Sequence, residues 1–84
     1  MAEELQAVEV LEKQLTALTE THKHVAGLIE KLARIQAELM DAGYDSRADE
    51  LAAPFSALSS AAENLQETSH SIEIERNQLR NEGR

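Results

Sequence analysis

Residues 8–39 read VEVLEKQLTALTETHKHVAGLIEKLARIQAEL, and their apolar side chains recur at alternating steps of three and four residues. That spacing is the heptad period of a helix that packs along one seam against another helix. Polar residues such as Lys13, Glu20 and Arg34 occupy the opposite side. The pattern predicts a helix over about residues 3–42, roughly 60 Å long. Its seam positions are Val8, Leu11, Leu15, Leu18, His22, Val25, Ile29, Leu32, Gln36 and Leu39.

A turn is predicted at residues 43–46, directly after this helix. Gly43 suits the left-handed backbone conformation that ends many helices. Ser46, with Asp49 three residues later, resembles a capping box, which is a signal for the start of a new helix.

The second helix is predicted over about residues 47–81 and has the same heptad period. Pro54 conflicts with a continuous helix, because an interior proline removes a hydrogen bond and crowds the preceding turn. We therefore expect a kink or break near Pro54, or a short helix at 46–52 followed by a longer one. The seam positions are Ala48, Leu51, Phe55, Leu58, Ala62, Leu65, Ser69, Ile72, Arg76 and Leu79.

Two amphipathic helices joined by a short loop fold back on each other in antiparallel order. Aligning the seams places His22 and Ser69 in one polar layer, and it brings the acidic start of the chain beside its arginine-rich end. We predict an all-α fold with a single domain over residues 1–84. The fold is an antiparallel two-helix coiled-coil hairpin that is expected to dimerise into a four-helix bundle. A parallel pair of long single helices, or a domain-swapped pair opened at Gly43, satisfies the same heptads.

The composition excludes several classes of protein. Cysteine is absent, which excludes a disulfide-stabilised mini-protein, a cysteine-based zinc module and a thiol enzyme. The formal net charge is −8 and there is no basic stripe, so direct binding to nucleic acid or to an anionic membrane is not expected. The shortage of β-branched and aromatic residues disfavours a sheet. With no apolar span and no signal peptide in the sequence, we expect a cytoplasmic protein.

The candidate reactive residues are three histidines and a serine. His22 and His24 are two residues apart and point in different directions, whereas zinc ligands on one helix usually lie four apart. We expect His22 and Ser69 to form a polar core layer that fixes the register, with a pH-sensitive switch or a metal site with His70 as alternatives. Ser69, His22 and an acid resemble a catalytic triad, but a leucine seam offers no oxyanion hole or pocket. We expect no enzyme activity, no metal site and no cofactor.

The loop-proximal half of the hairpin carries apolar residues beside the seam, whereas the distal half carries polar ones. A chain this short has little net stability alone, so the wide apolar face indicates that another helical surface packs there. A second copy is the simplest partner, and a different protein is the alternative. Tyr44, in the turn, is a further candidate contact. The expected interface residues are Leu28, Ala33, Ile35, Met40, Leu51 and Phe55.

The sequence therefore predicts a non-enzymatic protein–protein interaction module, such as a small helical adaptor, chaperone or regulator. It is expected to act as a homo-oligomer, in the simplest case a homodimer, through its apolar loop-proximal face. The alternative is an acidic inhibitor that mimics nucleic acid and blocks a basic target protein. That alternative rests on the acid excess of the second helix, where Arg47 is the one base between residues 45 and 75. The acids are Asp45, Asp49, Glu50, Glu63, Glu67, Glu73 and Glu75.

Overall fold

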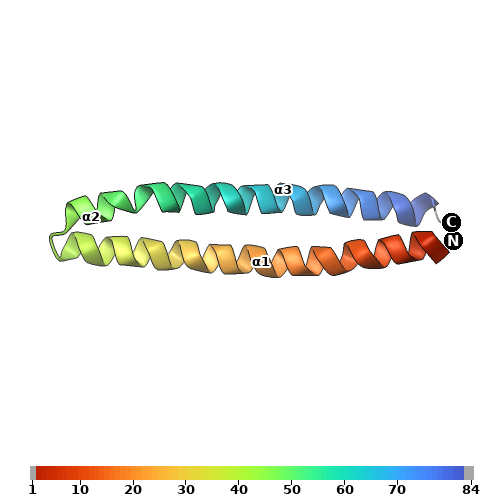
Figure 1. Cartoon of the computed structure of the whole chain (residues 1–84), viewed down its shortest axis with the longest axis horizontal. Helices are drawn as coiled ribbons and strands as arrows, with labels where there is room; N and C mark the ends of the chain where they lie inside the picture. Colours follow the sequence, from red (N-terminus) through yellow and green to blue (C-terminus); the bar gives the residue numbers. More distant parts are fainter. Residues whose placement is uncertain (1, 83–84) are drawn as a thin grey trace.

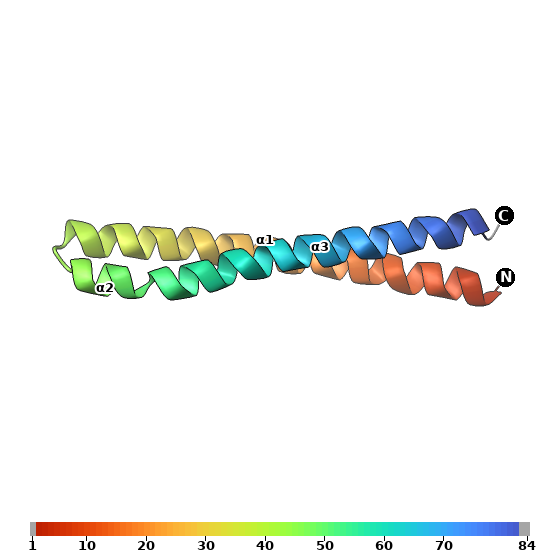
Figure 2. The same ribbon diagram turned by 90° about the horizontal axis from the view of Figure 1, so that it is seen from above.

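A computed structural model describes residues 2–82, and in this range the chain forms three α-helices. Helix α1 (Ala2–Asp41) runs the length of the molecule, and α2 (Asp45–Glu50) and α3 (Ala52–Glu82) return beside it (Figure 1). The molecule measures 63 × 14 × 13 Å, and α1 and α3 wind around each other along this rod (Figure 2). The predicted all-helical, antiparallel hairpin is confirmed.

The side chains at the predicted heptad positions form the seam between α1 and the return helices. From Leu11 to Leu39, and from Leu51 to Leu79, each seam residue is half-buried. Among the described residues, Val8 and Ala48 alone are buried, with exposed fractions of 8% and 0%. A two-helix seam covers each side chain on one side only, so the contact is continuous but shallow.

The turn after α1 is a Schellman motif. Gly43 has a φ of +87°, its N–H donates to the Met40 carbonyl at 3.1 Å, and the Tyr44 N–H donates to the Leu39 carbonyl at 2.8 Å. These two bonds satisfy carbonyl groups that the end of a helix otherwise leaves without a partner. The glycine is required here because a Cβ makes this left-handed conformation unfavourable.

The predicted capping box at Ser46 is not formed. Helix α2 begins two residues earlier than predicted, at Asp45, and Tyr44 is its N-cap residue, with no side-chain capping bond. The Schellman motif explains the shift, because it fixes Tyr44 directly above the end of α1. The Tyr44 carbonyl is then free to accept the first helical bond of α2, from the Ala48 N–H at 3.0 Å.

The return helix is interrupted at Leu51, three residues before Pro54. The Leu51 N–H donates to the Ala48 carbonyl at 3.1 Å, and the Leu51 carbonyl accepts the Phe55 N–H at 3.0 Å. Pro54 consequently lies in the first turn of α3, where its missing N–H forfeits no helical hydrogen bond. The break also removes the clash that a proline ring makes with the carbonyl four residues before it.

Gln36 replaces an apolar residue in the seam at the level of this break. Its Nε2 donates to the Ala48 carbonyl at 3.3 Å in a partly buried contact. This carbonyl has lost its usual helical partner, the N–H four residues later, because α2 ends at Glu50. The amide therefore fastens α1 to the interrupted segment.

The two interior glycines of the described chain make a matched test of the turn. Gly43→Ala should lower the free energy of unfolding by about 1–2 kcal/mol, because alanine is strained at a φ of +87°. Gly27→Ala should raise it by about 0.5–1 kcal/mol, since Gly27 is helical and an added Cβ meets nothing within 4 Å. Urea unfolding followed by circular dichroism, at one chain concentration, measures both. A Gly43→Ala variant as stable as the wild type contradicts the assigned turn.

Candidate interaction surface

The residues expected to form the partner interface fall into two groups. Leu28, Ile35 and Met40 are large, apolar and roughly half exposed, at 48%, 47% and 54%, and Ala33 is also exposed. Leu51 and Phe55 are half-buried seam residues at the break between α2 and α3. These two therefore contribute first to the packing within the hairpin.

The exposed members do not share one face of the rod. Leu28 and Ile35 are seven residues apart, so they lie on the same edge of α1. Ala33 and Met40 each lie five residues after one of them, which is about 140° further around a continuous helix. The seam passes between these two edges. The apolar residues beside the seam are thus divided between two opposite faces of the hairpin.

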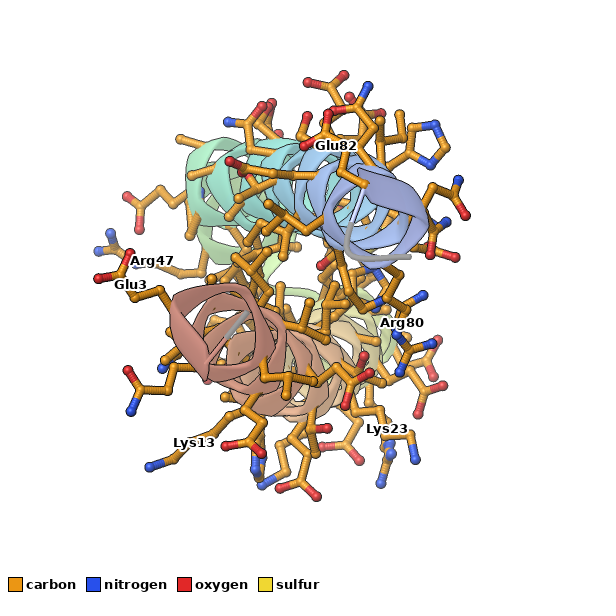
Figure 3. All side chains as sticks on the ribbon, turned by 90° about the vertical axis from the view of Figure 1, so that its right-hand side faces the viewer. Glu3, Lys13, Lys23, Arg47, Arg80 and Glu82 are labelled. Carbon is orange, nitrogen blue, oxygen red and sulfur yellow. The ribbon has the colours of Figure 1, made fainter. Side chains whose placement is uncertain are left out.

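The face that carries Leu28 and Ile35 is almost free of charge over the middle of the rod, and we call it the neutral face. Lys31 is the one charged residue at its positions between Ala7 and Ile35, and there is none between Pro54 and Ser71. Toward the ends of the rod the same heptad positions are charged, at Glu3, Glu38, Arg47, Glu50, Glu75 and Glu82. Glu3 and Arg47 both project on one side of the rod (Figure 3). The neutral face consists of Ala7, Val10, Gln14, Ala17, Thr21, His24, Leu28, Lys31, Ile35, Pro54, Ala57, Ala61, Asn64, Thr68 and Ser71.

The opposite face, which we call the charged face, carries Met40 and Ala33. Lys23 and Arg80 belong to it, and they project on the side of the rod away from Glu3 and Arg47 (Figure 3). Charged residues also occur on it, including along the middle of the rod, where Lys31 is the one charged residue of the neutral face. They are Glu9, Glu12, Lys23, Glu30, Glu63, Glu73 and Arg80.

The hydroxyl of Thr21, on the neutral face, already has a hydrogen-bond partner within α1. It donates to the Ala17 carbonyl of the same helix at 2.8 Å. A hydroxyl satisfied within its own helix needs no partner from water or from another chain. Thr21 can therefore be covered by an apolar surface at low cost, which extends the uncharged part of the neutral face toward the middle of α1.

Val10 belongs to this surface and was not among the predicted interface residues. It is 56% exposed and lies in the distal half of α1, where the sequence analysis expected a polar surround. Leu28 and Ile35 precede the first of the two seam residues in each heptad and directly flank the seam, whereas Val10 and Ala17 precede the second and lie further around the helix on the same edge. Together these residues form a stripe on α1, which consists of Val10, Ala17, Leu28 and Ile35. The stripe is evident only when both heptad positions are compared along the whole helix.

His22 and Ser69, the residues of the expected polar layer, lie beside a shared hollow. His22 and Ser69 are both half-buried and line an open hollow of about 300 Å³ together with Thr19, Lys23 and Gln66. Within the described range, no hydrogen bond joins the two side chains, and no carboxylate lines this hollow. The layer therefore lacks the acid that a triad requires.

Two other expectations concern the turn and metal binding. Tyr44 is 61% exposed, so its side chain is available to a partner. Across residues 2–82, no three histidine or acidic side chains lie close enough together to hold a metal ion. None of the helices in the same range is both long and apolar enough to cross a membrane.

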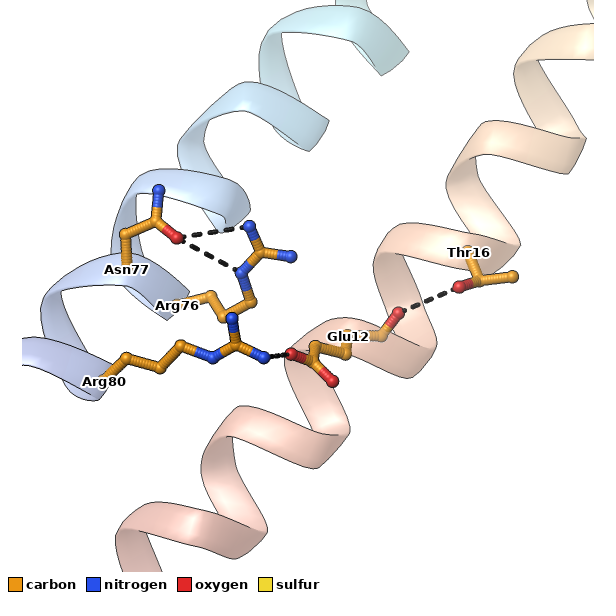
Figure 4. Close-up of polar contacts among 5 residues, drawn as sticks. All are labelled: Glu12, Thr16, Arg76, Asn77 and Arg80. Atoms are coloured by element: carbon orange, nitrogen blue, oxygen red, sulfur yellow. Dashed lines mark hydrogen bonds and ion pairs between the residues drawn. The ribbon is translucent and has the colours of Figure 1, made fainter. Parts of the chain in front are cut away.

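The distal end of the hairpin is fastened by charge on the charged face. Arg80 of α3 donates through Nη2 to Glu12 Oε1 of α1 (Figure 4). The Thr16 hydroxyl donates to the Glu12 backbone carbonyl at 3.2 Å, and Arg76 donates to Asn77 Oδ1 at 3.2 Å and 3.4 Å. The arginine–acid pair supports the predicted apposition of the acidic start and the basic end of the chain.

Comparison with known proteins finds no family model, curated protein or solved structure that matches this chain.

The Glu12–Arg80 pair offers a test of this alignment. Glu12→Arg alone should destabilise the hairpin by up to about 1 kcal/mol, since both side chains are partly solvated and a new like-charge contact replaces the pair. Adding Arg80→Glu should restore most of the loss. Urea unfolding at low and high salt measures the coupling between the two sites. Additive losses in the double variant show that the two side chains do not meet in solution.

Proposed function

We propose that this chain is a non-enzymatic protein–protein interaction module that acts as a homodimer through its neutral face. The observation that carries the proposal is the exposure of Leu28 and Ile35 on a face with almost no charge. Large apolar side chains exposed on a surface with few charges are typical of a site of protein association. The charged face is the one suited to remain in water.

The exposed area of the rod supports the same proposal. The chain exposes 6420 Å², whereas a compact monomer of this mass exposes about 5,000 Å². The excess, roughly 1,400 Å², arises because two helices cover only one side of each seam residue. Standard protein–protein interfaces bury about 800 Å² on each partner. A second copy packed on the neutral face removes an area of this standard interface size from water.

The dimer is the functional unit in this proposal, and it leaves other surfaces available to a second protein. Tyr44 and the open ends of the rod stay exposed when two neutral faces are joined. A bundle built in this way is a small adaptor or regulator whose shape is fixed by self-association. The proposal assigns no catalytic role to His22 or Ser69, which occupy seam positions.

The test compares two double variants that add the same charge to α1. Leu28→Asp with Ile35→Asp places four carboxylates in the proposed interface and removes four apolar side chains from it. Each of these contributes about 1 kcal/mol when its exposed half is buried, so the dimer should weaken at least a thousandfold in Kd. Ala33→Asp with Met40→Asp adds the same charge to the charged face and should leave the dimer intact. Size exclusion with light scattering, at several concentrations, gives the mass of each.

A third variant separates association from folding. Leu28→Ala with Ile35→Ala keeps helix propensity high and adds no charge. It should weaken the dimer while the circular dichroism at high concentration stays helical. A dimer mass that is unaffected by both neutral-face variants contradicts the proposal, as does a wild-type monomer at every concentration.

A further inference from the structure

We infer that the two copies pack neutral face to neutral face with their loops at opposite ends, so that α1 lies antiparallel on α1 of the second copy. This inference rests on the proposed function and specifies its geometry. It is carried by the order of residues along the neutral face, which is complementary to itself when one copy is reversed.

The α1 stripe supplies the main evidence. In an antiparallel helix pair, each layer joins the two different heptad positions of the interface. One such alignment places Ile35 opposite Val10 of the second copy and Leu28 opposite Ala17. The large apolar residues of the loop-proximal half then cover the smaller ones of the distal half. The two-fold axis passes between Thr21 and His24, so the layers on either side of it are identical, as an isologous dimer requires.

The α3 stripe agrees with the same axis. The contacts between Glu12 and Arg80, and between the residues that line the His22–Ser69 hollow, set the level of α3 relative to α1. The axis then crosses α3 near Ser69. The layer next to the axis joins Thr68 and Ser71, which are uncharged and small and let the two α3 helices approach closely. The layers beyond it join Asn64 with Glu75, and Ala61 with Gln78.

The opposite arrangement, with both loops at one end, is less complementary. It places α1 on α3 of the second copy, so Val10 faces the last turns of α3, where Glu75 and Glu82 occupy the neutral-face positions. It also sets the acids at the neutral-face positions of the two distal ends, which are Glu3, Glu75 and Glu82, side by side. With the loops at opposite ends, these acids lie instead beside the loop-proximal end of the other copy, where Lys31 and Arg47 balance Glu38 and Glu50 at the neutral-face positions. Like charges placed together disfavour an interface, so the reversed arrangement is selected by charge as well as by apolar matching.

Dipolar spectroscopy on one spin label per chain distinguishes the arrangements. The chain has no cysteine, so Ser46→Cys introduces a single labelling site on exposed α2. Ser46 lies about 20 helical residues from the axis, which at 1.5 Å per residue gives roughly 60 Å between the two labels. With both loops at one end, the labels are separated only by the width of the bundle, which is less than about 30 Å.

The distance between the two labels and the mass are measured on the same sample. Both are measured again on a second sample that also carries Leu28→Ala and Ile35→Ala. A dimer mass with a distance near 60 Å, lost in the second sample, supports the inference. A dimer mass with a short distance overturns the orientation and leaves the proposed function standing. A dimer whose distance is unchanged by the two alanines shows that another face is used. A monomer mass with no dipolar coupling overturns both.

Discussion

The leucine-rich seam between α1 and α3 is the contact on which the rest of this structure depends. It is long, because the heptad continues without a slip from Val8 to Leu39 and returns from Ala48 to Leu79. It is also shallow, because two helices can cover each seam residue on one side only. Apart from Val8 and Ala48, the seam residues stay partly exposed. The seam fixes the shape of the chain, and it leaves apolar surface uncovered on both sides of the rod. The two faces that result are distinguished by their charge.

The ends of the seam are held by different interactions. At the loop, backbone hydrogen bonds around Gly43 and Tyr44 turn the chain, and the Gln36 amide fastens the interrupted segment at Ala48. At the distal end, the Glu12–Arg80 pair links the two helices in solvent. The loop end is therefore fixed by geometry that is insensitive to salt, whereas the distal end depends on a partly exposed ion pair. We expect the distal end to open first when the hairpin is destabilised.

Much of this fold follows from residue spacing alone. The heptads predict the antiparallel hairpin, and Gly43 predicts the turn, because both depend on local rules with few competing solutions. The start of α2 could not be predicted in the same way. Ser46 and Asp49 form a recognisable capping pattern, but the Schellman bonds of the preceding helix had already committed Tyr44 to the cap position. Pro54 predicts a break in the return helix, and the backbone has this break at Leu51, between the end of α2 at Glu50 and the start of α3 at Ala52.

The interface prediction was limited by a different factor. Leu28, Ile35, Ala33 and Met40 all flank the seam, and their distance from it is evident from the sequence. The side of the seam on which each residue lies depends on its angle around the helix axis. This angle separates Leu28 and Ile35 from Ala33 and Met40. The same criterion adds Val10 and Ala17, which lie outside the immediate flanks. A face defined by two heptad positions on each helix describes the surface better than one defined by apolar residues near the loop.

The most direct test of this account is thermal unfolding measured across a roughly hundredfold range of chain concentration. If a second copy covers the neutral face, folding and association are coupled, and the midpoint temperature rises steadily with concentration. The Ala33→Asp, Met40→Asp variant should show the same dependence, and the Leu28→Ala, Ile35→Ala variant a reduced one. A midpoint that is high and independent of concentration would mean that the two-helix seam is stable by itself, which contradicts the central claim.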